Sequence, residues 1–87
     1  MNQQITILYF GHLVDMLGRD SEYMFLPLTV KTVAQLMQHL SRRGDAWTQV
    51  FAQPKPTLKI TVNKQFAEAD SPIQAGDEVA FVAFAMV

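Results

Sequence analysis

The stretch Ala75–Val87 (AGDEVAFVAFAMV) constrains the rest of the chain, because the nine residues from Val79 to Val87 include no polar side chain. A helical membrane span needs about 20 apolar residues, so this run is too short to cross a bilayer. An uncharged, strand-forming segment without proline would promote aggregation if it stayed in water. We therefore expect it to be paired within a sheet or covered by a partner.

The segment Ile5–Phe10 (ITILYF) is the expected neighbour of this run in the sheet. It is rich in β-branched and aromatic residues, and its length suits a strand but not a helix. Apolar residues on both of its faces predict a central position. If the first and last strands pair, they must run parallel, and parallel strands need a long crossover connection.

The strongest helix pattern lies within that crossover, over residues 32–45 (TVAQLMQHLSRRGD). Thr32 and Gln35 form a capping box at its start, and Gly44 is placed to end it. Apolar side chains recur at the spacing of one helix face, at Val33, Leu36, Met37 and Leu40. This helix is expected to lie across the sheet.

The remaining elements are short, and the whole chain, residues 1–87, is expected to form one domain. They are a helix or turn between Gly11 and Gly18, a strand in 22–28, a helical turn capped by Asp45, a strand at 58–62 and a weak edge strand in 65–70. This order predicts an α+β fold, the ubiquitin-like β-grasp, in which one main helix packs across a mixed sheet. Ferredoxin-like folds need a second long helix. An apolar tail follows from about residue 82 to residue 87.

The expected core contains side chains from the helix and from the central strands, namely Ile7, Leu8, Leu36, Leu40, Ile60, Val62, Val79 and Phe81. Phe84 and Met86 follow a strand that could end near Val82. They belong either to this core or to a surface that a partner covers.

Composition excludes several classes of function. Seven basic and eight acidic side chains give a net charge of -1, which favours neither nucleic acid nor an anionic membrane as a partner. The absence of cysteine excludes thiolate nucleophiles and cysteine-ligated metals within the chain. The N-terminus has no basic residue before Arg19, unlike a signal peptide, so the cytoplasm is the expected compartment.

No set of residues with enzyme-like spacing is present, so we predict no catalytic residues, no metal site and no bound cofactor. His12 and His39 are far apart in the sequence and have no neighbouring serine or cysteine to activate. Four carboxylates lack the pattern of a calcium loop and are expected to form a solvated rim: Glu68, Asp70, Asp77 and Glu78.

Three segments, at residues 5–20, 32–47 and 61–81, together resemble the small subunits of molybdopterin synthase, the MoaD-like sulfur carriers. The most specific pieces are Val62–Asn63–Lys64 and Ile73 followed by GDEVAF at 76–81. The resemblance covers nearly the whole chain, and that family has the β-grasp fold.

The resemblance implies a sulfur carrier in molybdenum cofactor biosynthesis. In that family an activating enzyme uses ATP to adenylate the terminal carboxylate, and sulfur then replaces AMP to give a thiocarboxylate. The tail enters the large subunit of a heterotetramer, where its sulfur is delivered to cyclic pyranopterin monophosphate. The small subunit is thus not itself catalytic, and the catalytic residues are expected on the large subunit. The implied partner interface comprises Phe81, Val82, Phe84, Met86 and Val87.

The tail departs from the family pattern, which ends in two glycines. Val87 lies where the first glycine would be, and it would be the sulfur-carrying terminus only if the chain is complete and active. Glycine allows a tail to thread a narrow channel, whereas valine is β-branched and stiff.

Three explanations remain open for this departure. The sequence stops short of the natural end, or the protein is a carrier-inactive homologue that acts as a docking or regulatory subunit, or it is a different binding module with this fold. If the natural chain ends at Val87, we expect no efficient adenylation or thiocarboxylate formation, and appended glycines should restore both.

Overall fold

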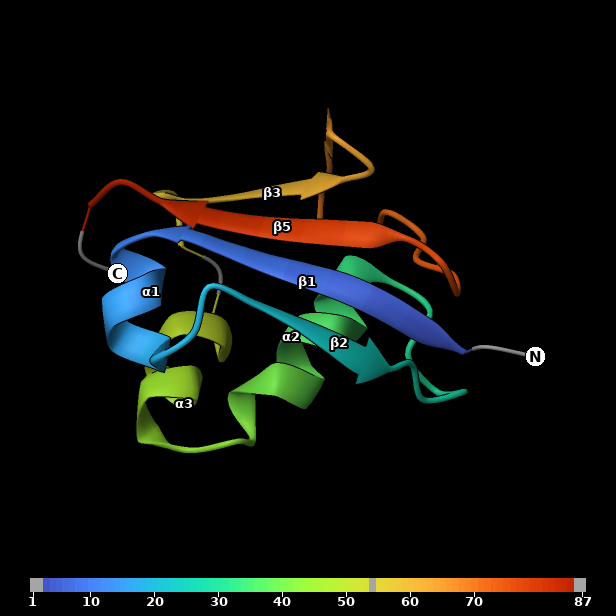
Figure 1. Cartoon of the computed structure of the whole chain (residues 1–87), viewed down its shortest axis with the longest axis horizontal. Coiled ribbons are helices and arrows are strands. Elements are labelled where there is room, and N and C mark those ends of the chain that lie inside the picture. Colours follow the sequence, from blue (N-terminus) through green and yellow to red (C-terminus); the bar gives the residue numbers. More distant parts are fainter. Residues whose placement is uncertain (1–2, 54, 86–87) are drawn as a thin grey trace.

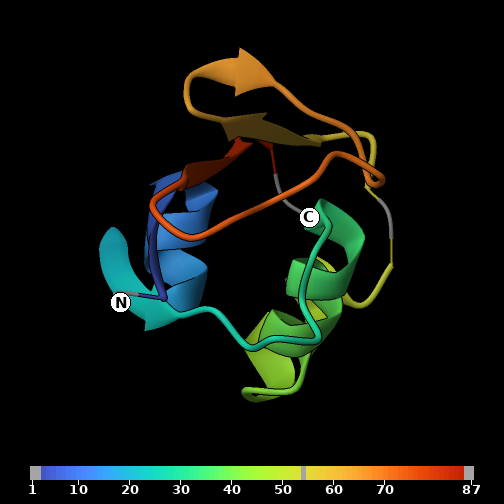
Figure 2. The same cartoon turned by 90° about the vertical axis from the view of Figure 1, so that its right-hand side faces the viewer.

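The computed structural model describes residues 3–53 and 55–85, which form a mixed five-stranded sheet with helices against one side (Figures 1 and 2). The elements in chain order are β1 (Gln4–Gly11), α1 (His12–Leu17), β2 (Ser21–Phe25), α2 (Val33–Ser41), α3 (Asp45–Phe51), β3 (Leu58–Val62), β4 (Gln65–Phe66) and β5 (Glu78–Ala83). Figure 2 shows α2 and α3 on the inner side of the curved sheet. Within these residue ranges, no helix is long and apolar enough to span a membrane.

The sheet has the strand order β2-β1-β5-β3-β4, so the first and last strands are neighbours in its interior. They run parallel, with Ile7 opposite Val79 and Tyr9 opposite Phe81. β2 pairs antiparallel with β1, and β3 pairs antiparallel with β5. The predicted β-grasp arrangement is confirmed. Its last strand, β5, ends at Ala83.

The core lies between the sheet and the helices, and it takes alternate residues from the longer strands. Ile5, Ile7 and Tyr9 of β1 are almost completely buried against the helices. The prediction that Leu8 also lies in the core is wrong, because successive side chains of a strand point to opposite faces. Ile60 and Val62 pack against the margin of the core and stay partly exposed. The other five predicted core residues are buried: Ile7, Leu36, Leu40, Val79 and Phe81.

The helix boundaries follow from local hydrogen bonds. The capping box of α2 is present, since the Thr32 hydroxyl accepts from the Gln35 N–H while the Gln35 side chain accepts from the Thr32 N–H. Gly18 ends α1 in the left-handed conformation, as expected. Asp45 does not cap α3; it is the first helical residue, and Gly44 holds the cap position without a side-chain bond.

The Asp77 carboxylate is buried, so the prediction that it belongs to a solvated rim is wrong. It accepts hydrogen bonds from the Asn63 side-chain amide at 3.0 Å and from the Gln74 N–H at 2.9 Å. The Asn63 side chain in turn accepts from the Glu78 N–H at 3.0 Å. These bonds tie the turn after β3 to the start of β5, which explains physically why the two most specific sequence pieces occur together.

Candidate functional site

The candidate site is the place where the apolar tail leaves the sheet. β5 ends at Ala83, beside the end of β1 and the start of α1 (Figure 1). The side chain of Phe84, the next residue, is 81% exposed. The chain therefore leaves the sheet after Ala83 with a large apolar side chain in water.

Gly11 permits the close approach of β1 and β5 at this exit. It lies opposite Ala83 and has a φ of 69°, in the left-handed region that favours glycine. A Cβ at this position would overlap the backbone carbonyl oxygen of Ala83. Gly11 thus determines where the tail can leave, and the sequence analysis missed this role because it took Gly11 only as a boundary between elements.

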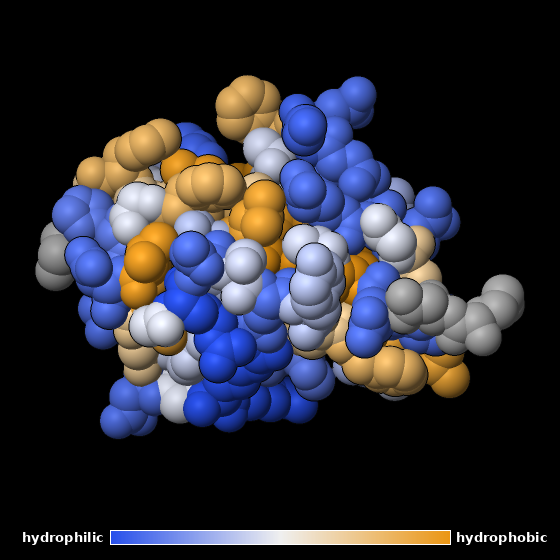
Figure 3. Space-filling model, in the orientation of Figure 1, coloured by the Kyte–Doolittle hydropathy of each residue, from blue (hydrophilic) through white to orange (hydrophobic). Residues whose placement is uncertain are grey.

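Apolar side chains surround the exit on the open face of the sheet. Phe10 is opposite Val82 in the parallel register, and both point away from the helices. Together with Leu8 and Phe84 they form the exit patch. Figure 3 shows apolar side chains gathered over β1 and β5 on this face of the molecule, above a strongly hydrophilic region. An exposed apolar patch of this kind is typical of an interaction site.

The structure separates the residues of the predicted partner interface. Phe84 and Val82 lie in the exit patch, whereas Met86 and Val87 are outside the described residues. The prediction is wrong for Phe81, which is completely buried. Because its side chain points to the opposite face from Val82, it packs against Tyr9 and Phe51, with ring centroids 6.2 and 5.0 Å away.

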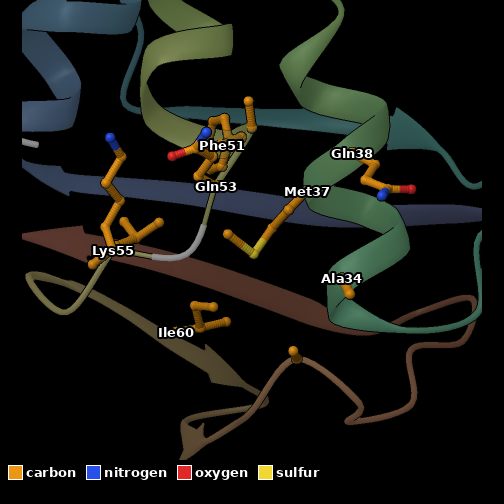
Figure 4. Close-up of a pocket in the computed structure, with 10 residues that line it drawn as sticks. Ala34, Met37, Gln38, Phe51, Gln53, Lys55 and Ile60 are labelled. Atoms are coloured by element: carbon orange, nitrogen blue, oxygen red, sulfur yellow. The ribbon is translucent and has the colours of Figure 1, made fainter.

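An apolar groove of about 300 Å³ lies between α2, α3 and β3 (Figure 4). Met37 points into it from α2, and Ile60 lies across it on β3. Lys55 is the one titratable side chain of its lining. Its lining therefore offers no acid–base pair and is mostly apolar, with Gln38, Gln53 and Lys55 as its polar side chains.

The described residues also contain no other site with metal-binding or catalytic geometry. His12 and His39 are both exposed, on different helices. Within residues 3–53 and 55–85, no group of three or more histidine, aspartate or glutamate side chains is placed to hold a metal ion. The predictions of no catalytic residue and no metal ligand stay predictions.

A polar cluster that sequence analysis missed joins β1 and β2 to the end of α2. The Tyr9 hydroxyl donates to Glu22 Oε2 at 2.8 Å, and Arg43 Nη1 donates to the same oxygen at 2.7 Å. Arg19 is 3.4 Å from it. Both arginines also lie over the Trp47 ring, at 4.8 Å for Arg43 and 5.8 Å for Arg19.

The pKa values in this cluster show an ionised carboxylate beside a neutral phenol. Burial, and then the hydrogen bond to Glu22, raise the pKa of Tyr9 far above its ordinary value. Burial alone would raise the pKa of Glu22, but hydrogen bonds from Arg43 and Tyr9 and the nearby positive charges outweigh it and lower the pKa. Neither group is poised to exchange protons near neutral pH, so the cluster is a structural anchor.

Comparison with known proteins identifies the family. The family profile described as "ThiS family" matches residues 7–85, which include Gly11 and the whole exit patch. The chain belongs to the ThiS family. A molybdopterin synthase sulfur carrier subunit from Escherichia coli strain K12 is 31% identical over 77 residues, covering 88% of this chain and 90% of the relative. A second such subunit, from Dictyostelium discoideum, is 28% identical, and the match covers 94% of this chain and 93% of the relative.

Solved structures place this ThiS-family chain among ubiquitin-like β-grasp proteins. A putative molybdopterin converting factor subunit 1 from Pyrococcus furiosus has a TM-score of 0.74 at 20% identity, covering 94% of this chain and 98% of that one. Urm1 from Trypanosoma brucei has a TM-score of 0.71 at 20% identity, covering 98% and 95%. At this identity the likeness supports the fold alone, and it agrees with the strand order. The family match and the 31% identical sulfur carrier subunit confirm the resemblance to MoaD-like carriers that the sequence indicated.

We predict that Gly11→Ala destabilises this ThiS-family domain more than Gly18→Ala does. Both glycines have positive φ, at 69° and 76°, but their ψ values differ. Gly18, with a ψ of 19°, is in the left-handed helical region, where alanine costs about 1 kcal/mol, whereas the ψ of -137° at Gly11 is open almost only to glycine, so the backbone cost is also larger at Gly11. A Cβ meets Ala83 only at Gly11, whereas nothing lies within 4 Å at Gly18. Urea unfolding of the two variants measures the difference. Equal losses of stability would show that the strand ends separate without cost.

We predict a pH dependence of stability that requires Glu22. Because the folded-state pKa of Glu22 is below its ordinary value of 4.5, its ionised form stabilises the fold above that pH. This contribution, on the order of 1 kcal/mol for a partly exposed group, is lost as the pH falls through the folded pKa.

The measurement is the difference in unfolding free energy between the wild type and Glu22→Gln as the pH is lowered. The difference should be largest near neutral pH and should shrink in acid. Glu68→Gln, which removes an exposed carboxylate outside this cluster, is the control for the change in net charge. A constant difference for Glu22→Gln across the acid range would contradict the assigned role.

Proposed function

We propose that this chain is the sulfur carrier subunit of a molybdopterin synthase and acts in molybdenum cofactor biosynthesis. The observation that carries the proposal is the exit geometry: an apolar tail leaves the end of β5 beside the exit patch, with Phe84 in water. Membership of the ThiS family and the names of the curated relatives support it. A domain that presents its tail to another protein needs no catalytic residues of its own.

The chemistry proposed for the tail takes place on partner proteins. On an activating enzyme, an oxygen of the terminal carboxylate attacks the α-phosphorus of ATP and releases pyrophosphate. A sulfur donor then displaces AMP, which leaves a thiocarboxylate at the terminus. In the large subunit the sulfur is transferred to cyclic pyranopterin monophosphate, and water restores the carboxylate. ATP is thus a substrate of the activating enzyme and not a cofactor of this chain.

The described residues of this chain serve to present the tail. Parallel pairing with β1 holds β5 as far as Ala83, and Gly11 lets the two strand ends lie close together. Beyond that point the chain is no longer paired in the sheet, and the Phe84 side chain is exposed. The exit patch gives the large subunit an apolar surface to cover while it receives the tail. We propose that the working assembly is a cytoplasmic heterotetramer of two small and two large subunits.

Sulfur transfer can be tested by mass spectrometry of the intact protein isolated from its own cells, which also identifies the natural terminal residue. With ATP, a sulfur donor and an activating enzyme, we expect one terminal oxygen to be replaced by sulfur. Adding the large subunit and cyclic pyranopterin monophosphate should then yield molybdopterin. A reaction without ATP is the control. A protein that binds the large subunit but never acquires sulfur would instead be a docking or regulatory subunit.

If the large subunit docks at the exit patch, Phe84→Asp should raise the Kd for the large subunit at least about tenfold, a loss of about 1.4 kcal/mol of binding free energy. Phe66→Asp is the matched control, because Phe66 is 87% exposed, compared with 81% for Phe84, but lies on β4. Titration calorimetry with the purified large subunit measures both variants. Equal weakening by the two substitutions would place the interface elsewhere or make it nonspecific.

A further inference from the structure

The sheet has two free edges, and they differ in length. The strand order places β2 at one edge and β4 at the other. β4 has two residues, Gln65 and Phe66, whereas β2 has five, Ser21–Phe25. A short edge strand offers little to pair with, but a longer one presents a row of backbone donors and acceptors.

The pairing of β2 with β1 shows which backbone groups face outward. The Tyr9 N–H donates to the Asp20 carbonyl at 2.9 Å, and the Leu26 N–H donates to the Gln3 carbonyl at 2.6 Å. In an antiparallel pair, residues that bond to the neighbouring strand alternate with residues that do not. Asp20 and Leu26 flank the strand, so its even-numbered residues face β1. Its odd-numbered residues direct their N–H and C=O groups to the free edge: Ser21, Tyr23 and Phe25.

Side chains of the same residues lie on the open face of the sheet. Tyr23 is 78% exposed, and Phe25 is also largely in water; we call these two residues the edge patch. β2 contains no lysine, proline or glycine, the residues that usually protect a free edge. Its one charged side chain, Glu22, points toward the helices and is already paired with Arg43.

We propose that β2 pairs antiparallel with β2 of a second copy of this chain, with Tyr23 opposite Tyr23 of that copy. In this register Ser21 lies opposite Phe25, and each of these pairs exchanges backbone hydrogen bonds through its outward groups. The two tyrosine rings meet on the open face, as cross-strand aromatic pairs do. A single two-fold axis relates the copies, so the interface is closed and ends at a dimer.

β2 is complementary to itself in this antiparallel register, and this favours β2 of a second copy over an unrelated strand as its partner. None of the outward-facing residues is charged, so no charge pattern selects a different partner. The net charge of -1 also produces little repulsion between copies. β1 separates β2 from β5, so pairing at this edge leaves Phe84 exposed. The dimer therefore does not depend on the sulfur-transfer function.

The first test is light scattering during size exclusion, with the full chain loaded from about 10 μM to about 1 mM, a range suited to a small interface. The apparent mass of the wild type should rise from that of one 9.8 kDa chain toward twice that mass. Tyr23→Lys should abolish the rise, while Phe66→Lys, at an exposed phenylalanine on the other edge, should leave it unchanged. A wild type that stays monomeric, or equal effects of both variants, would overturn the proposal.

The second test identifies the register directly, because residues 1–87 contain no cysteine that would compete with an introduced one. In the proposed pair the two Cα atoms at position 23 are about 5.5 Å apart, within reach of a disulfide. Under mild oxidation Tyr23→Cys should form a covalent dimer at least about tenfold faster than Phe66→Cys, which reports random collision. Equal rates would overturn the proposed register and with it the interface. Circular dichroism of each variant checks that the fold is retained.

Discussion

The parallel pairing of β1 with β5 is the interaction on which the rest of the structure depends. It places the first part of the apolar run, as far as Ala83, in the middle of the sheet, where both edges of β5 are hydrogen-bonded. Parallel strands cannot be joined by a tight turn, so the chain between them must cross over one face, and α2 and α3 lie on that face. The same pairing determines the point at which the tail becomes free.

Both ends of β5 are held by specific contacts, which determine the point at which the chain leaves the sheet. At its start, the buried Asp77 carboxylate and the Asn63 side chain bind the preceding turn to the strand. At its end, Gly11 allows the backbone of β1 to lie against Ala83. A carrier whose tail must enter another protein benefits from such an arrangement, because less conformational entropy is lost when the tail is captured.

The open face carries two apolar surfaces that suit different partners. The exit patch lies beside the tail, in the position that a protein receiving the tail would cover. The edge patch lies along β2, where free backbone groups accompany the exposed side chains. The helix side has no comparable free backbone edge, but it has the groove beside Met37. Separate surfaces allow an assembly with the large subunit and a contact between copies of this chain to coexist.

Periodicity and local signals in the sequence determined the elements. The spacing of apolar residues and the capping box located α2, and the polar-free end of the chain required a paired strand. Resemblance of short motifs indicated the family and also pointed to Phe84 at the exit.

The sequence left ambiguous the face of the sheet on which each side chain of an all-apolar strand lies. Leu8 and Ile7, or Phe81 and Val82, are equally apolar, and only the packed sheet assigns one of each pair to the core. The tertiary structure alone also decided the roles of Asp77, Glu22 and Gly11, because their partners are far away in the sequence. Such contacts form only when the sheet brings distant segments together, so no local pattern encodes them.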